Sequence, residues 1–169
     1  LSSNSSHKAV FAGTFDPVTN GHIDVAYRAS LLFDQVVVGV YDTPPKRLLF
    51  NTAERVDLFR QALDDRNLSN VDVIPYTGLT VKFAASLRAR VIVRGLRIGL
   101  DFEHEREMAL VWRKLAPEME VIMLIASLEN QYVSSTRVKE IASLGADISS
   151  FVPPHVQGIL AKRLGNPGG

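Results

Sequence analysis

The stretch from Gly13 to Ala29 reads GTFDPVTNGHIDVAYRA and separates an apolar run from an amphipathic one. Its first ten residues are rich in Gly, Thr, Asp, Pro, Asn and His, which are residue types of turns and helix starts. The pattern predicts a strand that ends at residue 13, a turn, and a helix that begins near residue 21. Two hypotheses follow for the turn: it only joins strand to helix, or it also binds phosphate.

The same alternation continues along the chain. Near-continuous apolar runs such as QVVVGVY at 35–41 are typical of parallel strands covered on both faces. Segments with apolar residues at helical spacing lie between these runs. We expect strands at 8–13, 35–41, 71–76, 90–95 and 120–126, and helices at 21–33, from 51, at 80–88, at 101–115, from 134 and from 154. This order predicts an α/β fold with a doubly wound, five-stranded parallel sheet and helices on both faces.

Three elements carry more detailed predictions. Pro75 lacks a backbone N–H, so its strand should end early or lie at an edge of the sheet. Asn51 with Glu54 three residues later predicts a capped helix start. In the helix at 101–115, four apolar side chains at helical spacing predict one stripe that faces the core: Met108, Val111, Trp112 and Leu115.

Composition excludes several classes of function. The length of 169 residues fits one domain, and the formal net charge of +1 gives no general case for binding nucleic acid or membrane. The chain has no cysteine, so disulfides and thiolate chemistry are excluded. No apolar run approaches the roughly 20 residues of a membrane span. We expect one cytoplasmic domain over 1–169, with a tail or tag remnant at 1–7 and a flexible tail at 165–169.

The unusual polar residues follow the ends of the predicted strands. In a doubly wound sheet, ligands bind beyond the carboxyl ends of the strands, where the strand order reverses. Five loops reach that edge with hydrogen-bond donors and cations: Thr14, Asp16, Asn20 and His22 after the first strand, Lys46 after the second, Gly78 and Thr80 after the third, Arg94 to Arg97 after the fourth, and Ser134 to Thr136 after the fifth. This convergence predicts one ligand site.

These residue types suit a polyphosphate. Helix starts at His22 and at Ser134 to Thr136 would offer unpaired N–H groups and the positive ends of helix dipoles. Two arginines three residues apart can clamp phosphate oxygens, and Lys46 adds a mobile charge. No Ser-His-Asp or paired-carboxylate arrangement is evident, which favours direct group transfer by positioning and charge over a covalent intermediate.

Each signal also has a simpler interpretation. His22 fits an ordinary helix start, and the serines at 134 and 135 fit a plain N-cap. The RGLR segment at 94–97 fits a solvated basic turn, and the acidic residues between 101 and 107 fit an exposed helix face. Trp112 fits the core or an interface better than a ligand platform.

Three motifs together carry a family resemblance. GTFDPVTNGH at 13–22, RGLR followed three residues later by DFE, and VSSTRVKE at 133–140 occur in this order. The combination resembles the bacterial phosphopantetheine adenylyltransferases, which belong to the nucleotidyltransferase superfamily with the (H/T)xGH signature, here residues 19–22. The resemblance covers roughly Lys8 to Leu164. It implies a Rossmann-like parallel sheet, a homohexamer, and transfer of the adenylyl group of ATP, with Mg²⁺, to 4′-phosphopantetheine.

The resemblance also implies roles for individual residues. Thr14 and His22 would stabilise the transition state at the α-phosphate, with Lys46 and Arg94 as the other catalytic side chains. The acceptor would contact Thr14, Lys46, Leu79, Thr80 and Arg94. ATP would contact Thr14, Phe15, His22, Gly95, Leu96, Arg97, Glu105, Asn130, Gln131, Tyr132, Val133, Ser134, Ser135 and Thr136. No side chain is expected to bind the metal, and no general base is required.

Two positions depart from the family pattern. Trp112 stands where an Asn usually lines the pantetheine arm, and His104 replaces a Tyr. The indole would either reshape the acceptor pocket or turn away into a subunit contact. Two alternative functions also stay open: another adenylyltransferase of the superfamily, such as one acting on nicotinate mononucleotide, and a non-catalytic ATP-binding α/β module.

Overall fold

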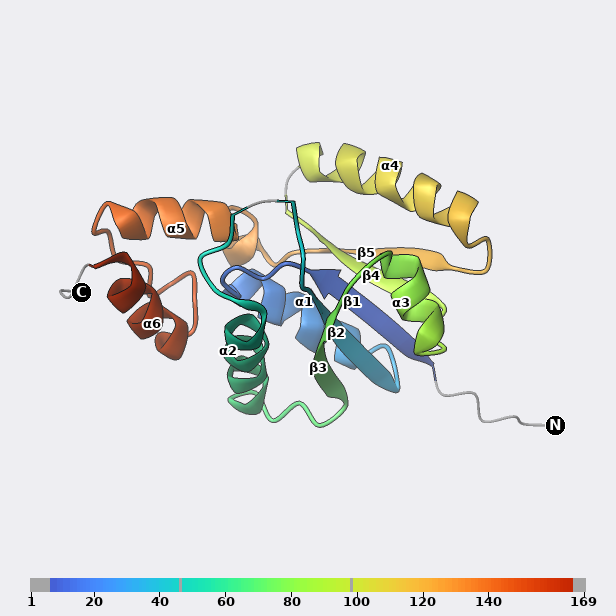
Figure 1. Ribbon diagram of the computed structural model, residues 1–169, viewed down its shortest axis with the longest axis horizontal. Helices are drawn as coiled ribbons and strands as arrows, with labels where there is room; N and C mark the ends of the chain where they lie inside the picture. The colour runs from blue at the N-terminus through green and yellow to red at the C-terminus, as the bar shows by residue number, and fades with distance from the viewer. Residues whose placement is uncertain (1–6, 46, 98, 166–169) are drawn as a thin grey trace.

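The predicted sheet is present in the computed structural model, which describes residues 7–45, 47–97 and 99–165 (Figure 1). All neighbouring strands are parallel, in the order β3-β2-β1-β4-β5. The strands are β1 (Lys8–Gly13), β2 (Gln35–Tyr41), β3 (Val71–Tyr76), β4 (Val91–Leu96) and β5 (Glu120–Ile125), each within one residue of its predicted bounds. The fold class is therefore confirmed, and so is the edge position of the strand that holds Pro75.

Alternate side chains of each strand enter two separate cores. Ala9 and Phe11 of β1 pack in one core, whereas Val10 and Ala12 pack in the other. In β2, Val36 and Val38 likewise pack in the same core as Phe11, and Val37 packs in the same core as Val10. Because both faces of the sheet are buried, the strands need apolar residues at successive positions, which explains the continuous runs in the sequence.

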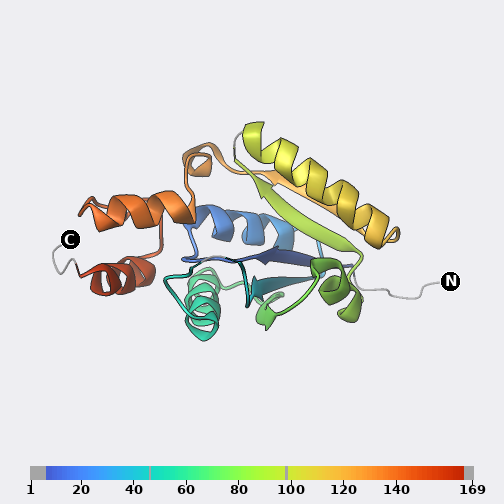
Figure 2. The same ribbon diagram turned by 45° about the horizontal axis from the view of Figure 1, so that its top comes forward.

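Helices cover both faces. The first core holds residues of α1 (Asn20–Ser30), α2 (Thr52–Asp64), α5 (Ser135–Ser143) and α6 (Pro154–Leu164), and the second holds residues of α3 (Thr80–Ser86) and α4 (Gly99–Leu115). Figure 2 shows α5 and α6 beyond the end of the sheet, with α4 along β4 and β5. A short 3₁₀ helix at Leu128–Asn130 was not predicted.

Capping boxes mark where two helices begin. Thr19 caps α1 together with His22, and Asn51 caps α2 together with Glu54, each pair forming a reciprocal capping box. The predicted start of α2 is therefore confirmed. None of the described helices is both long and apolar enough to cross a membrane.

The predicted apolar stripe of α4 is only partly correct. Trp112 is buried and Met108 packs against the second core, but Val111 and Leu115 are 52% and 55% exposed. The reason is that α4 packs on β4 and β5 at one edge of the sheet, so only a narrow strip of the helix is covered. The sequence pattern predicts an apolar face but not how much of it finds a partner.

Candidate active site

A cleft of about 310 Å³ lies where the strand order reverses, between the carboxyl ends of β1 and β4. This is the position at which open α/β sheets bind ligands. It is bordered by the starts of α1 and α5 and by one residue of α4. Its lining consists of residues 11–16, Thr19, Gly21, His22, Val25, Arg94, Gly95, Arg97, Glu105, Ala126, residues 133–136 and Lys139.

The turn after β1 is shaped by Phe15 folding back over Gly13. Phe15 has a positive φ of 52°, and a Cβ atom added to Gly13 would lie 2.7 Å from the Phe15 ring. The ring is buried and packs edge-on against the rings of Phe11, Phe59 and His22. Gly13 is therefore needed for close approach, and the turn borders the cleft with its phenyl ring held in the core.

The capping box of α1 fixes the protonation state of His22. Its Nδ1 lies 3.1 Å from the backbone N of Thr19, which can only donate a hydrogen bond. Nδ1 must therefore be unprotonated, and the neutral ring carries its proton on Nε2. Burial, followed by the positive charges of Arg97 and Arg94, lowers the pKa of His22 from 6.5 to about 3. At neutral pH, His22 is an uncharged hydrogen-bond donor at the edge of the cleft.

Arg94 is held from three directions. Its Nε and a terminal nitrogen donate to the two oxygens of the Glu105 carboxylate at 2.6 and 2.7 Å. Its other terminal nitrogen donates to the carbonyl of Ala12 on β1. Its guanidinium carbon lies 5.8 Å from the centre of the Trp112 ring. Glu105 is buried, so the acidic run is not a fully exposed face, and both of its oxygens serve to orient the arginine.

Arg97 brings a second guanidinium to the same cleft. It donates to the carbonyl of Val133 at 3.1 Å and so joins the end of β4 to the segment before α5. Gly95 allows β4 to approach α1 closely, because a Cβ atom there would lie 3.0 Å from Val25. Three residues of the RGLR segment, Arg94, Gly95 and Arg97, therefore line the cleft, and its simpler interpretation as a solvated basic turn is wrong.

The two serines that open α5 have structural partners. The Ser134 hydroxyl accepts from the backbone N–H of Arg137 at 3.2 Å, and the Ser135 hydroxyl donates to the carbonyl of Pro17 at 2.8 Å. The first serine is thus an N-cap, and the second fastens α5 to the turn after β1. Residues 134–136 still line the cleft, so the start of α5 can present its unpaired backbone N–H groups to an anion there.

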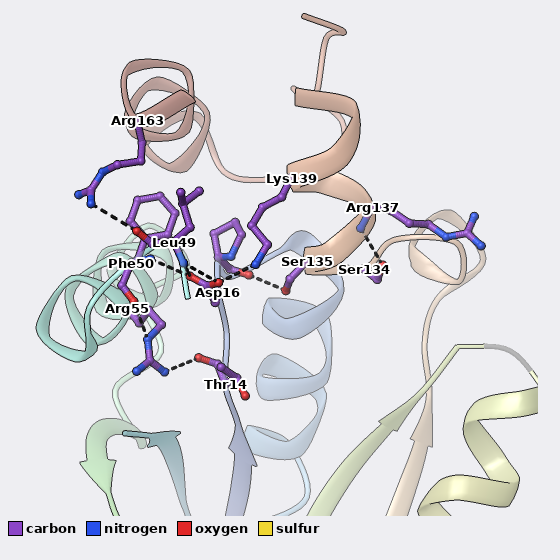
Figure 3. Close-up of polar contacts among 11 residues, drawn as sticks. Thr14, Asp16, Leu49, Phe50, Arg55, Ser134, Ser135, Arg137, Lys139 and Arg163 are labelled. Carbon is purple, nitrogen blue, oxygen red and sulfur yellow. Dashed lines mark hydrogen bonds and ion pairs between the residues drawn. The ribbon is translucent and has the colours of Figure 1, made fainter. Parts of the chain in front are cut away.

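Asp16, which the sequence predicts at the ligand site, is the centre of a buried polar network (Figure 3). Its carboxylate accepts from the backbone N–H groups of Leu49 and Phe50, at 3.0 and 2.9 Å, and from Lys139 of α5 at 2.6 Å. Arg55, which is fully buried, donates to the carbonyls of Thr14 and Tyr41. The network connects the turn after β1, the segment before α2, and α5.

The structure gathers most of the predicted site residues, but not all. The predicted residues that line the cleft are Thr14, Phe15, His22, Arg94, Gly95, Arg97, Glu105, Val133, Ser134, Ser135 and Thr136. The predicted residues that do not line the cleft are Leu79, Thr80, Leu96, Asn130, Gln131 and Tyr132. Asn130 is buried behind Gly21, while Tyr132 is exposed and packs edge-on against Phe151. Lys46 and the predicted tail residues 1–6 and 166–169 lie outside the described residues.

Among the polar residues of the cleft, Thr19 and Lys139 were missed, and Asp16 was predicted at the site but without its partner. Thr19 and Asp16 stand inside the quoted turn motif, and Lys139 stands inside VSSTRVKE. A signal was available for Thr19, because Thr followed three residues later by a side-chain acceptor predicts a cap. The pairing of Asp16 with Lys139 gave none, because 123 residues separate them.

Anion-binding groups at the switch point of a doubly wound sheet define a nucleotide-binding α/β protein. A family model described as cytidylyltransferase-like matches residues 10–141. Phosphopantetheine adenylyltransferase of Thioalkalivibrio sulfidiphilus is 50% identical over 93% of this chain and 98% of its own length. That of Methylacidiphilum infernorum is 46% identical over 94% and 91%. The chain belongs to the cytidylyltransferase-like family and, within it, to the phosphopantetheine adenylyltransferases.

Solved structures confirm the fold at lower identity. A bifunctional NMN adenylyltransferase/ADP ribose pyrophosphatase from Francisella tularensis superposes with a TM-score of 0.69 at 17% identity. The match covers 93% of this chain and 49% of that one. At this identity the similarity concerns the arrangement of sheet and helices alone.

Proposed function

We propose that this nucleotidyltransferase moves the adenylyl group of ATP to 4′-phosphopantetheine and releases pyrophosphate, the adenylyl transfer of coenzyme A synthesis. The observation that carries the proposal is one cleft that combines a neutral His22, the guanidinium groups of Arg94 and Arg97, and the starts of two helices. Each of these groups stabilises phosphate oxygens. The names of the relatives supply the acceptor.

The chemistry needs one bond to form and one to break. An oxygen of the acceptor phosphate attacks the α-phosphorus of ATP, and the bond from that phosphorus to the bridging oxygen of the β-phosphate breaks. The electron pair leaves with pyrophosphate. The attacking oxygen is already anionic, so no base has to remove a proton. His22 is suited to this reaction because its lowered pKa keeps it a donor and makes it a poor proton acceptor at neutral pH.

The proposed residue roles are those that the family resemblance implies, and the positions in the cleft are compatible with them. His22 and Thr14 would contact the α-phosphate, where negative charge grows in the transition state. Arg97 and the start of α5 would hold the β- and γ-phosphates. Arg94 would meet the acceptor phosphate. Further contacts remain part of the proposal: ATP with Leu96, Asn130, Gln131 and Tyr132, and acceptor with Lys46, Leu79 and Thr80.

We propose that Mg²⁺ enters with ATP. Among the described residues no group of three His, Cys, Asp or Glu side chains could hold a metal. The two carboxylates of the cleft already have partners, Asp16 with Lys139 and Glu105 with Arg94. Phosphate oxygens and water would therefore supply the metal ligands, which suits Mg²⁺ because it keeps several waters. When bound, the ion would neutralise charge on the triphosphate.

The predicted homohexamer and cytoplasmic location belong to the same proposal. Exposed apolar side chains gather on α4 and on the edge strand β5: Phe102, Leu110, Val111, Leu115, Ile122 and Ile125. An edge strand beside an apolar helix face favours association with another chain. A cytoplasmic location would give the enzyme access to its nucleotide substrate.

Pyrophosphate release tests the function directly. The purified chain is incubated with Mg²⁺ and ATP and with either 4′-phosphopantetheine or nicotinate mononucleotide, and a His22→Ala variant is run beside it. We expect release with 4′-phosphopantetheine only, and its loss in the variant. Release with nicotinate mononucleotide but not with 4′-phosphopantetheine would contradict the proposed acceptor and support adenylyl transfer to nicotinate mononucleotide. Binding of ATP without release from either acceptor would contradict the proposed function.

A further inference from the structure

Trp112 lies two helical turns after Glu105 on α4, and both contact the same guanidinium. A separation of seven residues puts two side chains on one face of an α-helix. That face of α4 packs against β4, the strand that carries Arg94. The helix thus presents a carboxylate and an aromatic face to one arginine.

The Trp112 ring is only 8% exposed and belongs to the second core, which also contains Ala12, Ile92 and Met119. It is anchored by packing and therefore cannot turn away to solvent. A guanidinium within about 6 Å of an indole centre is attracted to the ring face. The Arg94 guanidinium carbon meets this condition at 5.8 Å. Through this ring, the core therefore contacts an arginine that lines the cleft.

We propose that Trp112 is a positioning residue that, with Glu105 and the Ala12 carbonyl, fixes the Arg94 guanidinium for the acceptor phosphate. The proposal rests on the proposed function for the identity of that phosphate. The Glu105 carboxylate engages one edge of the guanidinium and the Ala12 carbonyl engages the remaining terminal nitrogen. The indole restrains the Arg94 guanidinium from a third side. The arginine therefore keeps one orientation, whereas a free arginine would sample several rotamers.

Kinetics of three variants separate positioning from general destabilisation. Trp112→Leu removes the aromatic face and keeps an apolar side chain, whereas Trp112→Phe keeps an aromatic face. Met119→Ala is the matched control, because Met119 is buried in the same core and the contacts of Arg94 do not include it. Pyrophosphate release is measured with 4′-phosphopantetheine varied at saturating ATP, and then with ATP varied.

We expect Trp112→Leu to raise the KM for 4′-phosphopantetheine about fivefold, the effect of losing one partly desolvated cation–aromatic contact. Trp112→Phe should recover part of this loss. Neither variant should change the KM for ATP or kcat by more than about twofold, and Met119→Ala should leave both KM values within the same limit. Equal increases in the two KM values, or the same increase in the control, would overturn the proposal.

A measurement on the ligand-free protein keeps this test separate from the proposed function. If the unaltered chain releases no pyrophosphate with 4′-phosphopantetheine, the proposed function fails, and a double-mutant cycle tests Trp112 instead. Trp112→Leu, Arg94→Lys and the double variant are unfolded with urea. Non-additive effects on the unfolding free energy would support positioning. Additive effects would overturn it.

Fluorescence gives a second readout of the same contact. Trp112 is the one tryptophan of the chain, so the emission of the folded protein reports on its surroundings alone. We expect the emission to change in Arg94→Lys, because the guanidinium no longer lies over the indole. An unchanged emission spectrum would overturn the contact between the two side chains.

Discussion

At the scale of single residues, the start of α1 decides which ring nitrogen of His22 carries the proton. The backbone N–H of Thr19 donates to Nδ1, so the proton of the neutral ring lies on Nε2, which the proposed function uses as a donor. We expect His22→Ala to fold and to lose about 10²- to 10³-fold in kcat, the usual cost of removing one donor from a transition-state oxygen. His155→Ala is the control, because His155 bonds the carbonyl of Leu58 and does not line the cleft. Equal losses in both variants, measured as pyrophosphate release, would contradict the role of His22.

The lowered pKa of His22 also predicts how stability depends on pH. Because the folded chain holds this ring neutral down to a pKa of about 3, the unfolded chain binds the extra proton first, near 6.5. The contribution of His22 to stability is therefore complete above pH 6.5 and is lost progressively as the pH falls toward 3. Urea unfolding between pH 7.5 and 5 measures this, and the slope should be smaller in His22→Ala. Parallel slopes in the two proteins would show that His22 titrates normally when folded.

At the scale of elements, Asp16 joins three segments that the sheet alone would not hold together. Its carboxylate is 2% exposed and binds Lys139 of α5 and the backbone before α2. We expect Asp16→Asn to lower the unfolding free energy by about 2 kcal/mol, because Lys139 is left partly buried without its counter-charge. Hydrogen exchange should rise in α5 and at residues 49–50.

Asp57→Asn provides the control for Asp16→Asn. The Asp57 side chain is 76% exposed and pairs with Arg60 one turn along α2, so its loss should change the unfolding free energy by less than about 0.5 kcal/mol. If both variants unfold at the same urea concentration, the buried network does not connect these segments as the structure indicates.

At the scale of the whole molecule, the exposed apolar side chains of α4 predict self-association. Leu110 is 56% exposed on this helix. If the proposed hexamer forms, we expect Leu110→Glu to dissociate it into smaller, folded species, because a charge would be buried in the contact. Leu144→Glu is the control: it alters an exposed leucine after α5, away from this face. Sedimentation velocity measures the size. An unaltered chain that sediments as a monomer would contradict the proposed hexamer.

Much of the fold could be predicted because its signals are local. Apolar runs gave the five strands, and polar residues at 51 and 54 gave a helix start. The site residues that could be predicted are those in loops that follow strands, because parallel strands bring these loops to one edge of the sheet. The extent of the apolar face of α4 was not predicted, because coverage depends on which strands the helix packs against.

By itself, the sequence determined the α/β class, the turn at 13–22 and the family, since each depends on residue types at short spacing. Only the tertiary structure decided what those residues do to one another. In the folded chain Arg94 pairs with Glu105 and lies over the Trp112 ring, and Asp16 pairs with Lys139. These contacts join residues 11 to 123 positions apart, and their geometry depends on how helices settle on the sheet. Patterns over a few residues do not depend on that packing. The charged residues of the site could therefore be predicted from the sequence, but their partners could not.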